Sequence, residues 1–240
     1  MKTALSQTSG KIDARRGAIR WLIRETLGNL FLIAILFGVV GRWDWWMGWA
    51  LVAVYITWTA ATAIFILPVN AAMLAERARP HADTPKWDMA LLSLLGVFMV
   101  GAYVVASLDV RLGWSPPYPL AWQVVGLLGA IIGNDILLVW AMVTNSFFVA
   151  TVRIQSERQH TVVSSGPYRY VRHPGYAGAA LFYLATPLML GSWWAYIPTA
   201  GVLAIIVVRA LLEDKTLQEG LPGYQEYSAR VRYRLLPGVW

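Results

Sequence analysis

The 240-residue chain contains no cysteine, which excludes disulfide bonds, thiolate metal sites and a cysteine nucleophile. Histidine is almost as scarce, because the three histidines form no HExxH motif or comparable ligand spacing. No metal ligand is therefore assigned, and metal chemistry is not expected. Charged residues make up only 14% of the chain, which argues against a soluble globular protein.

Long apolar runs are what the chain has instead of charge, and hydrophobic residues make up 58% of it. Five runs are long enough to span a bilayer, and they cover residues 21–40, 45–67, 87–108, 120–144 and 193–212. A sixth run, 177–190, is nearly long enough. We expect the short run to form a tight hairpin with the last one through Gly191 and Ser192. The predicted fold is an all-α, polytopic membrane bundle of five to six transmembrane helices.

Basic residues are distributed unevenly between the predicted loops. If both termini face the cytoplasm, most loop lysines and arginines lie on that side, and the opposite side keeps only Arg42 and Arg111. The predicted organisation is a mobile cytoplasmic tail over residues 1–20, transmembrane helices one to four over 21–144, and a carboxyl-terminal region over 145–240. Basic cytoplasmic loops also account for the net charge of +7, so a nucleic-acid partner is not expected.

One polar and aromatic motif stands in the carboxyl-terminal region, in the stretch VVSSGPYRYVRHPGYAG over residues 162–178. Pro174 disfavours a helical conformation at His173 and suits the first position of a helix, so His173 is expected at a helix amino terminus. Such a terminus offers free N–H groups to a carboxylate or phosphate. The alternative is that these basic and aromatic residues only anchor a span at the headgroups.

A second motif lies near the end of the last apolar run, where Arg209 and Glu213 are four residues apart. Residues at this spacing share one helix face, so the two side chains can pair or can jointly bind a zwitterion. Ionisable residues at a membrane boundary are functional candidates, although an ordinary ion pair is the alternative. Because the predicted topology brings both motifs to the cytoplasmic side, together they predict a pocket that faces the cytoplasm.

In order and spacing the two motifs resemble those of the isoprenylcysteine carboxyl methyltransferase and phospholipid methyltransferase superfamily of integral membrane enzymes. The first motif reads His160-Thr161-Val162-Val163, Gly166-Pro167-Tyr168 and Arg172-His173-Pro174-Gly175-Tyr176-Ala177-Gly178. The second reads Arg209, Glu213, Asp214, Leu217, Tyr224, Tyr227 and Arg234-Leu235-Leu236-Pro237. Val162 and Asp214 depart from the family's Leu and Glu, and Asp214 is assigned no role. The first 140 residues match only as helical spans.

The resemblance implies a methyltransferase that uses S-adenosyl-L-methionine and acts on a lipophilic or small membrane-accessible acceptor, such as an isoprenylcysteine carboxylate or a lipid. Arg209 and Glu213 are the expected catalytic pair, and Arg209 and Asn145 are expected to contact the acceptor. The expected cofactor contacts are Gln155, His160, Thr161, Val162, Val163, Tyr168, His173, Pro174, Gly175, Tyr176 and Glu213. The expected partners are the bilayer and the methyl acceptor.

Two other functions remain open at this point. Sterol reductases resemble this carboxyl-terminal fold, so an NADPH-dependent membrane reductase is the nearest alternative, and cofactor binding separates it from a methyltransferase. A non-enzymatic transporter would show internal symmetry, and no repeat is visible. Asn134 and Asp135 lie inside the fourth run, where helix-to-helix hydrogen bonding and acceptor contact explain them equally well.

Overall fold

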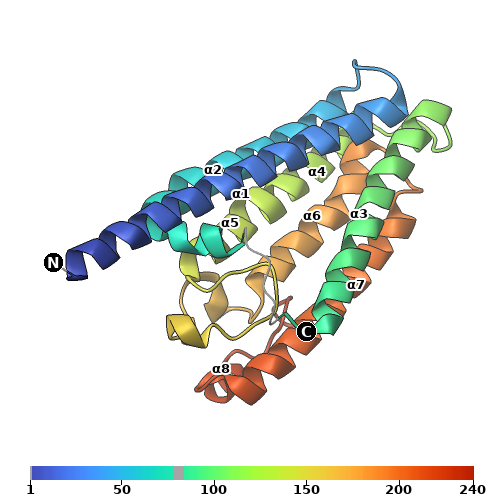
Figure 1. Ribbon diagram of the computed structural model, residues 1–240. Coiled ribbons are helices and arrows are strands. Elements are labelled where there is room, and N and C mark those ends of the chain that lie inside the picture. The colour runs from blue at the N-terminus through green and yellow to red at the C-terminus, as the bar shows by residue number, and fades with distance from the viewer. Residues whose placement is uncertain (1, 78–83) are drawn as a thin grey trace.

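The computed structural model describes residues 2–77 and 84–240, and within these ranges every regular element is a helix (Figure 1). The elements are α1 (Lys2–Val40), α2 (Trp46–Arg77), α3 (Lys86–Leu112), α4 (Leu120–Ala130), the π-helix η1 (Ile131–Leu138), α5 (Val139–Thr144), the 3₁₀ helices η2 (Ser156–Arg158) and η3 (Gly166–Arg169), α6 (Pro174–Leu190), α7 (Tyr196–Gly220) and α8 (Tyr224–Arg230).

Among the described residues, five helical segments are long and apolar enough to cross a membrane: Arg16–Val40, Trp46–Arg77, Lys86–Leu112, Leu120–Thr144 and Tyr196–Gly220. The α6 helix, with 17 residues, is shorter. It ends at Gly191, whose φ of 76° lies in the left-handed region that glycine adopts without strain, and α7 then packs back against it. The all-helical membrane bundle and the hairpin between α6 and α7 are therefore confirmed.

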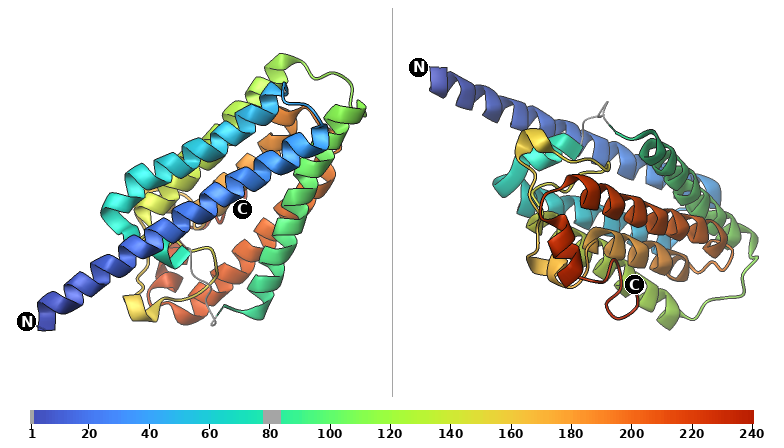
Figure 2. Two further views of the ribbon diagram at one scale, coloured as in Figure 1. Left: turned by 45° about the horizontal axis from the view of Figure 1, so that its top comes forward. Right: turned by 90° about the horizontal axis from the view of Figure 1, so that it is seen from below.

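The first helix begins earlier than predicted. It runs without interruption from Lys2, so residues 2–20 of the segment expected to be a mobile tail over 1–20 continue the first span as helix. This first part of α1 projects beyond the other helices (Figure 2).

Glycines allow α6 to pack closely against the span formed by α4, η1 and α5. A Cβ atom on Gly133 would lie 2.5 Å from the carbonyl oxygen of Gly178, and one on Gly126 would lie 2.3 Å from the backbone nitrogen of Met189. Small residues at helix interfaces let backbones approach in this way. The π-helix was not predicted, and it occupies the middle of this span, where Gly133 meets α6.

A kink directs the end of α2 toward the long loop. Pro68 removes a backbone donor, and Asn70 takes a non-helical conformation with φ −153° and ψ 60°. The Asn70 side chain then accepts a hydrogen bond of 3.1 Å from the N–H of Met73, which restarts the helix as an amino-terminal cap would.

The connections gather at two ends of the bundle. The 145–173 loop, α8, the carboxyl terminus and the beginning of α3 lie together at one end (Figure 1). The other end is closed by Asp109, which is 1% exposed and accepts hydrogen bonds from Ser115 and from Ser192 in the α6–α7 connection. Asp109 thus joins the α3–α4 connection to the α6–α7 connection at the end opposite the loop.

Candidate active site

A cavity of about 280 Å³ lies between the 145–173 loop, the beginnings of α3 and α6, and the second half of α7. Most of the predicted site residues line it: Asn145, His160, Thr161, Val162, Val163, Tyr168, His173, Gly175, Tyr176, Arg209 and Glu213. Two segments that are far apart in the sequence therefore meet around one cavity, as the two motifs predict.

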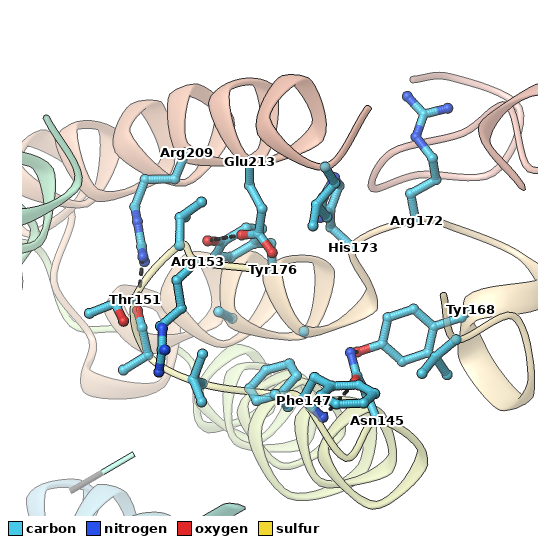
Figure 3. A pocket seen from close by; sticks show the side chains of 18 of the residues that line it. Asn145, Phe147, Thr151, Arg153, Tyr168, Arg172, His173, Tyr176, Arg209 and Glu213 are labelled. Carbon is cyan, nitrogen blue, oxygen red and sulfur yellow. Dashed lines mark hydrogen bonds between the residues drawn. The ribbon is translucent and has the colours of Figure 1, made fainter. Parts of the chain in front are cut away.

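Glu213 lies in this cavity against the first turn of α6. Its carboxylate accepts a hydrogen bond of 2.6 Å from the Tyr176 hydroxyl, and Figure 3 shows the two side chains pointing toward one another from α7 and α6. The bond holds one carboxylate oxygen, Oε2. A short bond to a charged acceptor is stronger than a neutral one, so it fixes the orientation of the carboxylate.

Arg209 is 5% exposed and shares the helix face of Glu213, but it pairs with a different carboxylate. Its Nε donates to Asp88 at 2.8 Å, and its Nη2 donates to the Ala150 carbonyl at 2.9 Å. The guanidinium also lies 5.5 Å from the centre of the Tyr176 ring. Among the described residues no ion pair joins Arg209 to Glu213, so the local pair that the spacing allows does not form, and each side chain has a partner on another element.

The beginning of α6 has the geometry predicted from Pro174. His173 precedes the helix with φ −125° and ψ 63°, and Pro174 is its first residue. A Cβ atom on Gly175 would lie 2.6 Å from the Phe148 ring, so only glycine allows the loop to approach the helix this closely. Pro174 is buried behind the lining residues, whereas Gly175 lines the cavity.

Asp214 is buried behind this site and holds it together. It is 1% exposed and accepts hydrogen bonds from Arg172 at 2.7 and 2.8 Å and from the Tyr224 hydroxyl at 2.9 Å. The His173 ring nitrogen lies 3.3 Å from the same carboxylate. In Figure 3 the Arg172 side chain accordingly points away from the other labelled side chains. The sequence assigned no role to Asp214, and the structure makes it the link between the loop, α7 and α8.

Gln155 is buried with its side chain turned into the loop. Its amide donates to the Phe147 carbonyl at 2.7 Å and accepts from Arg158 at 2.6 Å, and it does not line the cavity. We therefore leave Gln155, an expected cofactor contact, out of the proposed cofactor site. Its hydrogen bonds instead close the turn that presents His160.

His160 reaches the cavity from this turn and stacks on Phe147, with ring centres 4.3 Å apart. Burial, with the nearby Arg158 guanidinium, lowers the pKa of His160 to about 4. Its Nδ1 faces the backbone N–H of Gln155 at 3.4 Å, a position that suits an unprotonated nitrogen. The imidazole is therefore neutral near pH 7 and serves as a flat, uncharged wall.

Asn145 and Tyr168 form another side of the cavity. The Asn145 amide donates to the Tyr168 hydroxyl at 3.1 Å, and the Tyr227 hydroxyl donates to the Tyr168 carbonyl at 2.8 Å. Burial raises the pKa of Tyr168 above its ordinary value, so the phenol stays neutral. The predicted acceptor residue Asn145 thus stands next to the predicted cofactor residue Tyr168 (Figure 3).

Asn134 and Asp135 lie on η1 and do not line the cavity. The Asp135 carboxylate accepts a hydrogen bond of 3.1 Å from Thr57 of α2. This contact is the helix-to-helix hydrogen bonding that the sequence offered as one explanation for Asp135.

Comparisons with known proteins point to one enzyme family. Residues 125–219 match the model of the isoprenylcysteine carboxyl methyltransferase family. A probable protein-S-isoprenylcysteine O-methyltransferase of Oryza sativa subsp. indica is 38% identical over 66 residues, which are 28% of this chain and 35% of that protein. The segment over residues 125–219 is therefore similar to the isoprenylcysteine carboxyl methyltransferase family.

Other relatives carry the same name. The protein-S-isoprenylcysteine O-methyltransferase of Rattus norvegicus is 29% identical over 126 residues, 49% of this chain and 43% of that one. The chain therefore spans less than half of these relatives' length. A solved structure of the eukaryotic intramembrane Ras methyltransferase of this family superposes with a TM-score of 0.46 and 16% identity, covering 95% of each chain.

The five apolar helices, together with the similarity to this family, indicate a multi-pass membrane protein. Sequence reasoning missed one residue of this region, Asp88, which pairs with Arg209. Asp88 lies outside the segment that the family model matches, and an isolated aspartate at the start of an apolar run carries no motif. The only signal for it was a carboxylate at a membrane boundary, which by itself names no partner.

Proposed function

We propose that the protein is an S-adenosyl-L-methionine-dependent methyltransferase that methylates a carboxylate on a lipophilic acceptor of the isoprenylcysteine type. The observation that carries this proposal is the position of Glu213 and Arg209 one helical turn apart in a single cavity. Glu213 presents a carboxylate to a cation, and Arg209 presents a guanidinium to an anion. A cationic donor and an anionic acceptor would bind side by side at such a pair.

The cavity offers groups that suit each part of the cofactor. The Glu213 carboxylate suits the ammonium of its amino-acid tail, and the beginning of α6, where Gly175 and Tyr176 have N–H groups without a preceding helical turn, suits its carboxylate. Gly175 supports this fit, because a side chain at this position would collide with the Phe148 ring and fill the space in front of the first turn of α6. Aromatic faces near the cavity suit a sulfonium.

The extended backbone over residues 161–163 suits the adenine ring. Thr161, Val162 and Val163 line the cavity outside any helix, beside the neutral His160 ring that stacks on Phe147. Backbone N–H and C=O groups recognise a base edge irrespective of side chain, which explains why valine at position 162 in place of leucine is compatible with the role.

Arg209 and the apolar side of the cavity suit the acceptor. The guanidinium presents a planar, permanently charged group to a carboxylate, while Leu92, Leu95 and Ile206 provide an apolar wall between α3 and α7. Such a combination favours an acceptor with an anionic end and a long apolar part, which would enter from the bilayer.

When bound, S-adenosyl-L-methionine supplies an electrophilic methyl group on a sulfonium. A carboxylate is already ionised near pH 7, so the protein needs no general base to generate the nucleophile. The chain's own residues then have to hold two partners in line and exclude water, and alignment of this kind supplies about 7 to 11 kcal/mol in favourable cases. Arg209 orients the acceptor, and Glu213 with Tyr176 orients the donor.

We further propose that the cavity opens to the cytoplasm. The 145–173 loop, α8 and the carboxyl terminus lie at one end of the bundle, and most loop arginines and lysines belong to that end, whereas Arg42 and Arg111 belong to the other. The positive-inside rule supports a cytoplasmic position for the basic end.

The activity is tested with the protein purified into phospholipid vesicles, S-adenosyl-L-methionine labelled in its methyl group and an N-acetyl-S-prenylcysteine as acceptor. We expect label in a base-labile methyl ester, no transfer to the carboxamide of the same acceptor, and loss of transfer in Glu213→Gln. Glu219→Gln is the matched control, because Glu219 lies on the same helix, is 68% exposed and forms an exposed ion pair with Lys215. Oxidation of NADPH without methyl transfer would favour the reductase instead.

A further inference from the structure

Arg209 does not stand alone in the cavity, and the group that fixes its position comes from a part of the chain outside the family-matched segment. Asp88 lies in the first turn of α3 and is fully buried. We propose that Asp88 is a positioning residue that sets the Arg209 guanidinium in place for the acceptor carboxylate. The inference rests on the proposed function and adds a residue to it.

Both carboxylate oxygens of Asp88 accept hydrogen bonds from elements that surround the cavity. Oδ1 accepts from Arg209 Nε at 2.8 Å, and Oδ2 accepts from the backbone N–H of Val152 at 2.8 Å. Arg209 in turn donates through Nη2 to the Ala150 carbonyl at 2.9 Å. Asp88, Arg209 and residues 150–152 therefore form a closed ring of hydrogen bonds that connects α3, α7 and the loop.

The ring leaves part of the guanidinium for a ligand. Nε and one hydrogen of Nη2 are used by Asp88 and Ala150, while the side chain lies over the Tyr176 ring and lines the cavity. In Figure 3 the Arg209 side chain extends to the loop at Thr151. The Thr151 hydroxyl is buried and has no hydrogen-bond partner among the described residues, and it also lines the cavity. The remaining N–H groups of Arg209 and this hydroxyl are suited to one anionic group.

The charge of Asp88 matters as well as its shape. A buried arginine needs a carboxylate partner, because an unpaired buried charge is costly. In Asp88→Asn the new side chain would keep the volume but offer only one acceptor oxygen to two donors, so its amide N–H₂ would face either Arg209 or Val152. The guanidinium would then turn or the loop would move, and a misplacement of about 1 Å at a reacting centre costs about 100-fold in rate.

A matched control exists on the same helix. Asp109 is as deeply buried as Asp88, and it also accepts hydrogen bonds from another part of the chain, but it lies at the opposite end of α3. Its partners Ser115 and Ser192 do not line the cavity, whereas Arg209, the partner of Asp88, does. Asp109→Asn reports the general cost of removing a buried carboxylate from α3. Asp88→Asn reports that cost together with the loss of Arg209 positioning.

The test compares Asp88→Asn and Asp109→Asn with the wild-type protein in vesicles, with N-acetyl-S-prenylcysteine as acceptor. We expect Asp88→Asn to lower kcat/KM for the acceptor about 100-fold while the Kd for S-adenosylhomocysteine changes less than about threefold. Asp109→Asn should lower the unfolding temperature similarly and keep kcat/KM for the acceptor within about threefold. Asp88→Asn in an Arg209→Lys background should cost much less than in the wild type, because both changes disturb one interaction.

Asp88→Glu, which keeps the charge but lengthens the side chain, replaces Asp88→Asn if the latter does not fold, and the same separation between acceptor kinetics and cofactor affinity is expected. Unchanged acceptor kinetics, or a parallel loss of cofactor affinity and acceptor turnover, would overturn the positioning role. A wild-type protein that binds S-adenosylhomocysteine but leaves the prenylcysteine carboxylate unmethylated would overturn it too, together with the acceptor assignment. A wild-type protein that does not bind S-adenosylhomocysteine would overturn the proposed function itself.

Discussion

The Tyr176 hydroxyl donates a hydrogen bond of 2.6 Å to the Glu213 carboxylate, and this bond joins the first turn of α6 to the second half of α7. The two residues belong to the two separate motifs, so the bond is where the motifs meet. It holds one oxygen of the carboxylate, and Glu213 lines the cavity in which the proposed cofactor ammonium would bind.

Tyr176→Phe tests the importance of this bond. The ring remains, but the carboxylate loses a donor, and hydrogen bonds to charged groups contribute about 1.5 to 3 kcal/mol. We expect the Kd for S-adenosylhomocysteine to rise about tenfold, measured by isothermal titration. Tyr170→Phe is the control, since Tyr170 is 61% exposed and lies outside the cavity. The same affinity in both variants would remove Tyr176 from the cofactor site.

Asp214→Asn tests the buried network behind the cavity. Asp214 has Arg172, Tyr224 and Arg234 as partners, and removal of one member of a buried charge pair costs about 3 to 5 kcal/mol. We expect a large fall in the unfolding temperature in detergent. Glu219→Gln on the same helix should change stability by less than about 0.5 kcal/mol because its ion pair is exposed. Equal stability of the two variants would contradict the structural role of Asp214.

The lowered pKa of His160 predicts a specific pH dependence of the protein's stability. Its pKa is lowered to about 4 by burial and by Arg158, so between about 6.5 and 4 the unfolded chain binds a proton that the folded protein does not. The contribution of neutral His160 is therefore complete above about pH 6.5 and is lost as the pH falls toward 4. The unfolding temperature should drop less between pH 7 and pH 5 in His160→Asn than in the wild type. Parallel curves would show that His160 is not buried in its neutral form.

Gly133→Ala tests the close approach of η1 and α6. Its new methyl group would lie 2.5 Å from the Gly178 carbonyl oxygen and 2.6 Å from the Phe182 nitrogen, both of which are backbone atoms that cannot turn away. Overpacking of this kind costs about 1 to 3 kcal/mol. Gly96→Ala, on α3 with nothing within 4 Å of the new Cβ, should leave the unfolding temperature unchanged or raise it. A Gly133→Ala protein as stable as Gly96→Ala would contradict this packing.

The sequence was sufficient to predict the spans, and most of the site residues that it predicted line the cavity, for clear physical reasons. Apolar length dictates which segments cross a membrane, and proline before Gly175 dictates where α6 begins. The spacing of Arg209 and Glu213 correctly placed both on one helix face, and the predicted topology placed them at the same end of the bundle as the loop.

What the sequence could not predict depends on contacts between distant residues. Asp88 and Arg209 are 121 positions apart, and no local pattern indicates their pairing. Gln155 is equally able to face the cavity or the loop interior, and only the Phe147 carbonyl and Arg158 decide which. The spacing of Arg209 and Glu213 likewise left a local pair possible, whereas in the folded protein Arg209 pairs with Asp88 and Glu213 with Tyr176.

The most direct test of the central claim is isothermal titration of the detergent-purified protein with S-adenosylhomocysteine, with NADPH as the competing ligand and with Glu213→Gln and Glu219→Gln as a matched pair. We predict micromolar binding of S-adenosylhomocysteine to the wild type and to Glu219→Gln, loss of at least about tenfold in affinity in Glu213→Gln, and no binding of NADPH. Equal affinity in Glu213→Gln would contradict the assignment of Glu213, and binding of NADPH alone would contradict the methyltransferase.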